Sequence, residues 1–212
     1  MNMRSNETQR FLVLFKVLDS IYPFCKDDDL GGLLGVISPE LLQDGEPIDI
    51  AVTNEWDHYC ESFPWNISSA LDIICGFLRY YHEEYGFDYS ITLSYIENNA
   101  DRIDVAGAFF YQIEKNIERL NHTERYNKYG CFNPLRDELF WEIYEELLEL
   151  EQYGEIVSEP DKKPISYLRE LLQNDGPEWS YMLEFWHKDH PENRYKIGVC
   201  VRGAPTIQRV NS

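Results

Sequence analysis

Positive charge is scarce in this chain. Its 212 residues hold 19 Lys and Arg against 38 Asp and Glu, so the formal net charge is −19. A surface this acidic repels phosphate backbones and anionic lipid headgroups, which disfavours nucleic acid and membranes as direct partners. The same field attracts basic proteins and accelerates their encounter. We therefore expect a basic protein as the partner, with solubility alone as the alternative role of the acidity.

Long hydrophobic runs are also missing. No stretch approaches the roughly 18 apolar residues of a membrane-spanning helix. The segment Met1–Gln9 is polar. It lacks the basic region followed by an apolar region that is typical of a signal peptide. The five cysteines are odd in number and none forms a CxxC motif, which favours buried, reduced thiols over disulfides. The sequence therefore predicts a cytoplasmic protein.

Motifs of known chemistry are absent as well. The sequence contains no GxGxxG or GxxxxGKS/T loop for phosphate, no HExxH for zinc and no GxSxG for a nucleophilic serine. We therefore predict no cofactor and no enzymatic activity. The alternative is an enzyme or metal-binding protein that uses His58, Glu61 and His82 with nearby carboxylates.

Apolar content is sufficient for a packed core, since 43% of the residues are hydrophobic and 15% aromatic. Apolar side chains recur at helical spacing through most of the chain. The clearest such segment is 66–85, where we expect Asn66 to be the N-cap and Gly86 to end the helix. The other predicted helices are 7–24, 38–42, 49–62, 88–98, 101–121, 133–154 and 164–176.

The C-terminal region changes period. Apolar residues alternate in 179–186 and again in 195–202, on either side of a turn-forming segment at Asp189–Asn193, which predicts a β-hairpin. The expected fold class is α+β and predominantly α-helical: a helical bundle with a C-terminal antiparallel β-hairpin. We expect a single domain over 1–212, with a weak boundary near 155–163.

The segment Leu30–Gly35 is rich in glycine but lacks the spacing of a phosphate loop, so we interpret it as a flexible turn. Asp27, Asp28 and Asp29 precede it. Their spacing does not match a calcium loop, and carboxylates are favourable at a helix N-terminus, so they predict the start of a short helix near Leu30.

The acidic residues are concentrated in two segments. No Lys or Arg occurs from Asp27 to Leu78 or from Asp137 to Asp161. In the second segment, a helix places like charges on one stripe, where each pair repels by a few tenths of a kcal/mol. A solvated helix face explains such a stripe; the alternative is a face that a basic partner covers. The candidate partner-binding residues are Asp27, Asp28, Asp29, Glu46, Asp49, Glu55, Asp57, Glu138, Glu142, Glu145 and Glu149.

The stretch Asp28–Leu34, the turn Asp44–Pro47 and an acidic helix that contains tryptophan form a pattern of turns and charge. In this pattern, residues 25–95 resemble the small acidic bacterial immunity proteins of toxin–immunity systems. Those proteins neutralise toxins used in contact between bacteria. The resemblance implies a binding protein that covers the surface of a basic toxin, such as a nuclease. A regulatory module whose acidity only aids solubility is the remaining alternative.

Overall fold

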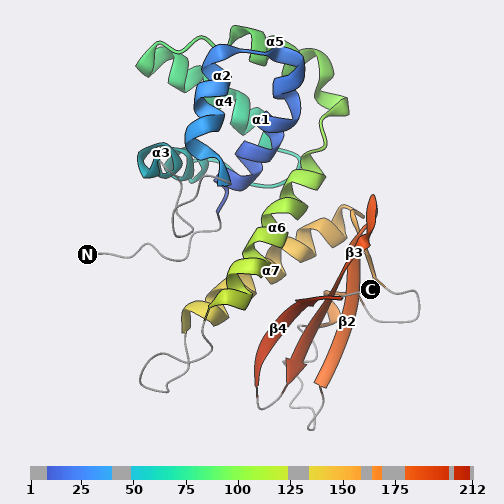
Figure 1. Ribbon diagram of the computed structural model, residues 1–212. Helices are drawn as coiled ribbons and strands as arrows, with labels where there is room; N and C mark the ends of the chain where they lie inside the picture. The colour runs from blue at the N-terminus through green and yellow to red at the C-terminus, as the bar shows by residue number, and fades with distance from the viewer. Residues whose placement is uncertain are drawn as a thin grey trace. The chain divides into compact units, whose positions relative to one another are not determined.

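Figure 1 shows the protein as a computed structural model. The structure describes residues 9–39, 49–123, 134–158, 164–168, 180–200 and 203–210. Within these residues it contains seven α-helices and a four-stranded antiparallel sheet near the C-terminal end. The predicted class, α+β and mostly α-helical, is therefore confirmed. None of the helices in these ranges is long and apolar enough to cross a membrane.

The chain divides into two compact units, one of residues 9–112 and one from Ile113 onward. The division falls inside the helix α6 (Val105–His122). The segment 155–163, which we expected as a weak boundary, begins with the short strand β1 (Ile156–Ser158), and residues 159–163 lie outside the described residues. That the two units act as a single domain stays a prediction.

The first unit is helical. It contains α1 (Phe11–Cys25), α2 (Asp28–Ile37), α3 (Ile50–Cys60), α4 (Ala70–Tyr85), α5 (Ser90–Asn99), the short 3-10 helix η2 (Ala100–Arg102) and the beginning of α6. The core is built around α1. This helix has apolar residues on more than one of its sides, and these residues are buried. Trp56 of α3 is fully buried, with its ring 5.5 Å from that of Trp65 and 5.1 Å from that of Phe77.

The glycine-rich segment is helical, so its interpretation as a flexible turn was wrong. Gly31, Gly32 and Gly35 lie within α2, whose apolar side chains form a buried stripe. Asp27 is the N-cap of this helix: its Oδ1 accepts hydrogen bonds from the backbone N–H groups of Asp29 and Leu30. Burial of the leucines and this cap offset the low helix propensity of glycine.

Helix α4 begins later than predicted. Ser69, and not Asn66, precedes its first residue, Ala70. Asn66 instead closes the preceding turn, where its Oδ1 accepts from the N–H of Ser69 at 3.0 Å. The predicted end is confirmed, because Gly86 follows the helix with a φ of 78° and its N–H reaches the carbonyl of His82.

The second unit combines helix and sheet. Its elements after α6 are α7 (Pro134–Gln152), β1, β2 (Ser180–His187), β3 (His190–Cys200) and β4 (Gly203–Arg209). The predicted hairpin is confirmed as β2–β3, where Leu183 pairs with Ile197 and Phe185 with Tyr195. Its turn is shorter than the predicted Asp189–Asn193, because β3 already begins at His190. Strands β1 and β4 extend it on both sides in the order β1-β2-β3-β4. Helix α7 packs on β1 and β4.

Candidate functional site

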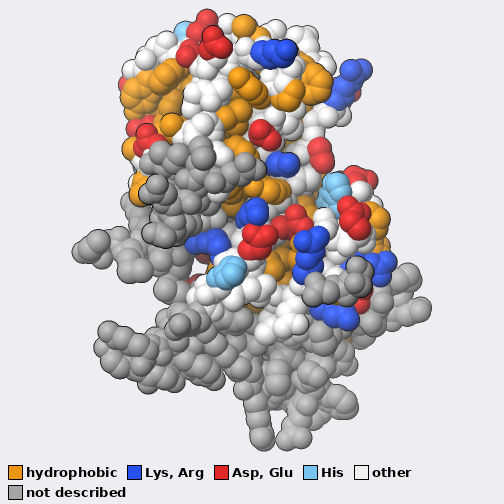
Figure 2. All heavy atoms as spheres, viewed as in Figure 1, with side chains coloured by type: hydrophobic (Ala, Val, Ile, Leu, Met, Phe, Trp, Pro, Cys, Tyr) orange, Lys and Arg blue, Asp and Glu red, His pale blue; other side chains and the backbone are white. Residues whose placement is uncertain are grey.

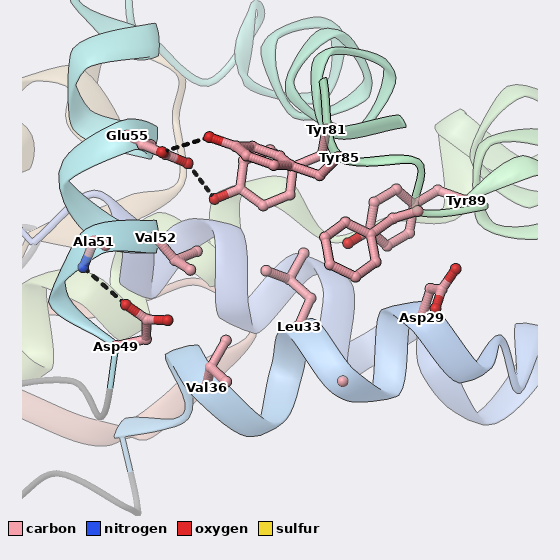
Figure 3. A pocket seen from close by; sticks show the side chains of 12 residues that line it. Asp29, Leu33, Val36, Asp49, Ala51, Val52, Glu55, Tyr81, Tyr85 and Tyr89 are labelled. Carbon is pink, nitrogen blue, oxygen red and sulfur yellow. Dashed lines mark hydrogen bonds between the residues drawn. The ribbon is translucent and has the colours of Figure 1, made fainter. Parts of the chain in front are cut away.

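A cavity of about 470 Å³ lies in the first unit, between α2, α3, the end of α4 and the segment 86–89 (Figure 3). We call it the acidic cavity. Its lining combines three carboxylates, four aromatic rings and small or aliphatic residues. These are Asp29, Asp49 and Glu55; Tyr81, Tyr85, Phe87 and Tyr89; and Gly32, Leu33, Val36, Ala51 and Val52.

Two of the carboxylates are positioned by helix N-termini. Asp29 lies in the first turn of α2, and its Oδ2 accepts from the N–H of Asp88 at 2.6 Å. Asp49 is the N-cap of α3, and its Oδ1 accepts from the N–H of Ala51 at 2.9 Å. The partial positive charge of a helix N-terminus stabilises a carboxylate there. Each side chain makes its bond through one oxygen, so the other remains available to a ligand as far as the described residues are concerned.

Glu55, the third carboxylate, is held by two tyrosines from α4. Its Oε2 accepts from the Tyr81 hydroxyl at 2.6 Å and its Oε1 from the Tyr85 hydroxyl at 2.7 Å (Figure 3). Burial, together with Glu55, raises the pKa of Tyr81 far above its ordinary value. The hydrogen bond to Glu55 raises the pKa of Tyr85 to about 12. Both phenols therefore stay protonated at neutral pH and fix the carboxylate in one orientation.

Aromatic rings form one wall of the acidic cavity. The ring of Tyr81 lies 5.0 Å from that of Tyr85 and 6.2 Å from that of Phe87, and Phe87 lies 6.1 Å from Tyr89. Tyr85 and Phe87 are 52% and 41% exposed, whereas Tyr81 and Tyr89 are buried. Leu33 and Val52 lie across from these rings (Figure 3). The wall is thus apolar and partly open to solvent.

The charge in the cavity is not neutralised by described residues. No described Lys, Arg or His lines it, and none of its three carboxylates forms an ion pair with a described side chain. The sheet of the second unit differs, because Glu184 lies 3.5 Å from Arg194 and 3.7 Å from Lys196. On the face drawn in Figure 2, Lys and Arg side chains likewise lie among Asp and Glu side chains. The cavity is therefore a local excess of negative charge.

Such a lining favours one class of ligand. Carboxylates accept charge-assisted hydrogen bonds from ammonium or guanidinium groups. The faces of tyrosine and phenylalanine rings attract the same cations, and aliphatic side chains cover an apolar stem. The arrangement can bind a cation carried on an aliphatic chain.

Of the predicted partner-binding residues, three meet at this cavity: Asp29, Asp49 and Glu55. Asp27 does not belong to an exposed face, since it is only 4% exposed. Besides capping α2, its Oδ2 accepts from the Thr92 hydroxyl at 2.8 Å. Its place among the partner-binding residues is therefore corrected: its role is structural.

The remaining predicted residues lie elsewhere. Asp28 is exposed on α2 and Asp57 is half-buried on α3. Glu46 lies outside the described residues. Within the second unit, α7 carries the predicted acidic stripe, with Glu138 and Glu145 exposed and Glu142 and Glu149 half-buried.

The aromatic half of the site was not predicted from the sequence. Tyr81 and Tyr85 recur at helical spacing with the apolar residues of the segment 66–85, a pattern that predicts a packed helix face and does not indicate a binding site. The signal that could have identified them is an i, i+4 tyrosine pair followed, after the helix-ending Gly86, by Phe87 and Tyr89. Such a cluster next to a segment without Lys or Arg places aromatic rings near unpaired carboxylates.

The histidines of the alternative site make contacts within the chain. His58 is exposed and pairs with Glu61 at 3.3 Å, and the Nδ1 of His82 lies 2.6 Å from the carbonyl oxygen of Phe87. These side chains form no cluster of three metal-ligating groups within the described residues. A different group, Glu155, His187 and Asp189, brings three such atoms within 4.8 Å of one another.

Contacts within the chain already engage that second group. The Lys188 ammonium pairs with Glu155. The N–H of Asp189 donates to the Nδ1 of His187 at 3.3 Å. The Lys188–Glu155 pair connects the residue before β1 to the β2–β3 turn.

Comparison with family models, with characterised proteins and with solved structures finds no match to the chain.

Proposed function

We propose that this chain is an acidic binding protein of the immunity type, which neutralises a basic toxin by covering part of its surface. The observation that carries the proposal is the acidic cavity. Three carboxylates, one from α2 and two from α3, line it with no described basic side chain among them. Uncompensated charge of this kind costs free energy by self-repulsion, and a cationic partner would relieve that cost.

The aromatic side chains at the cavity support a role in protein binding. Tyrosine is enriched at the centres of interfaces, because it buries a large area and keeps a polar tip for hydrogen bonds. Tyr85 and Phe87 are exposed beside the carboxylates, so a partner that covers them would gain hydrophobic area as well as ion pairs. Acidity that served only solubility would not require this combination.

The proposal is tested by capture from the organism's own extract with the intact chain as bait. The captured protein is then purified and its affinity measured at several salt concentrations. We expect a partner with a high isoelectric point, an affinity that falls as salt rises, and toxicity in a host cell that co-expression of this chain suppresses. A purified partner of acidic or neutral character, or an affinity that does not change with salt, would overturn the proposal.

A further inference from the structure

We infer that the acidic cavity receives the side chain of one arginine from the partner. This inference rests on the proposed function, because it names the chemical group by which the partner is recognised. The expected occupant is a guanidinium on an aliphatic stem. The lysine ammonium and neutral side chains are the competing occupants to be tested.

The arrangement of acceptors favours guanidinium. Asp29, Asp49 and Glu55 enter the cavity from α2, from the start of α3 and from the middle of α3 (Figure 3). Asp49 and Glu55 lie on one side of Leu33 and Asp29 lies on the other (Figure 3), so carboxylates line both ends of the cavity. A guanidinium presents five N–H donors around a plane and can bond to more than one carboxylate at once, whereas an ammonium has three donors around one nitrogen.

The aromatic wall favours the same group. A guanidinium is flat and weakly hydrated, so it stacks on rings at a small desolvation cost. Tyr85 and Phe87 offer exposed rings of this kind, while the hydroxyl groups of Tyr81 and Tyr85 hold Glu55 in place. Val36 and Val52 can cover the methylene stem. The volume of about 470 Å³ exceeds the needs of one side chain and leaves room for part of the flanking backbone.

The first test uses three blocked amino acids as probes of the full chain: N-acetyl-arginine amide, N-acetyl-lysine amide and N-acetyl-citrulline amide. Citrulline matches arginine in shape but carries no charge. Binding is followed by NMR shifts of the labelled tyrosine rings. We expect the arginine probe to move the signals of Tyr81 and Tyr85 and to bind about tenfold or more tightly than the citrulline probe. Equal binding of these two probes, or tighter binding of lysine, would overturn the inference.

Variants then locate the binding. Asp49→Asn keeps an N-cap acceptor for α3, and Glu55→Gln keeps an acceptor for one tyrosine hydroxyl, so both remove charge with little change of shape. Each should weaken the arginine probe by about tenfold. Glu83→Gln, at an exposed position of α4 outside the cavity lining, is the matched control and should leave the affinity unchanged. An equal loss in all three would overturn the inference, and thermal unfolding of Asp49→Asn shows whether the fold is intact.

The two proposals fail in different ways. If the arginine probe does not bind but the captured basic partner still does, the cavity is not an arginine site and the proposed function stands. If the probe binds at the cavity and no basic partner is obtained, the arginine site stands and the proposed function fails.

Discussion

Glu55 connects the charge of the acidic cavity to its aromatic wall. The Tyr85 hydroxyl donates to its Oε1, and this bond is the largest contribution to the raised pKa of Tyr85. A pKa raised to about 12 in the folded protein, against 10.0 ordinarily, means that the native state holds the phenolic proton more tightly than the unfolded state. This contribution to stability is complete below pH 10 and is lost as the pH rises through 12.

The substitution Glu55→Gln should lower the pKa of Tyr85 toward its ordinary value, because the charged acceptor is removed. Tyrosine labelled at the ring carbon next to the hydroxyl allows this pKa to be followed by NMR titration between pH 8 and 12. The exposed control Glu83→Gln should leave the pKa of Tyr85 unchanged. A Tyr85 pKa that does not move in Glu55→Gln would contradict the hydrogen bond.

Truncation of Asp27 should destabilise the fold. It caps two N–H groups of α2 and accepts from buried Thr92, so Asp27→Ala leaves three donors without their acceptor. We expect a loss of about 2–4 kcal/mol in the free energy of unfolding, measured by urea titration. Asp28→Ala, one position on and exposed, should cost about 0.5 kcal/mol or less. Equal effects at the two positions would refute the assigned roles.

Single residues show what a sequence can and cannot predict. Asp29, Asp49 and Glu55 were identified because they lie in a segment without Lys or Arg. The tyrosines that complete the cavity were not, because helical spacing marks a side chain as apolar-facing without saying what it faces. The bond from Tyr81 to Glu55 spans 26 positions of the chain, and such contacts depend on how helices pack.

At the scale of elements, α2 shows burial of apolar side chains competing with the low helix propensity of glycine. Gly35 lies on the exposed side of this helix, and a Cβ added there meets nothing within 4 Å. Gly35→Ala should therefore raise the free energy of unfolding by about 0.5–1 kcal/mol, measured by urea titration, since alanine loses less backbone entropy than glycine. A destabilised Gly35→Ala would indicate that this segment is a turn after all.

The periodicity of apolar residues predicted α3, α4, α5, α6 and α7, because each buries one face over several turns. It predicted β2 and β3 for the same reason, with a period of two. Strand β1 has three residues, too few to show alternation, and it forms because Ile156–Ser158 pairs with Phe185–His187 of β2. Short edge strands of this kind depend on pairing with a partner strand, so the local sequence did not reveal it.

At the scale of the whole molecule, net charge and its placement have different effects. A charge of −19 speeds encounter with any basic protein. Specific affinity depends on where carboxylates lose water against a partner's cations. Pairs such as Glu184 with Arg194 and Lys196 show that part of the acidity is balanced within the chain. At the acidic cavity, three carboxylates lie together without an ion pair to a described side chain.

The most direct test compares two triple variants of equal net charge in their affinity for the purified basic partner. One, Asp29→Asn with Asp49→Asn and Glu55→Gln, neutralises the cavity; the other, Asp72→Asn with Glu83→Gln and Asp101→Asn, neutralises exposed positions outside its lining. We predict that the cavity variant loses about 100-fold or more in affinity while the control loses about threefold or less. Equal losses would contradict the account, because they would mean that the partner senses only the total charge.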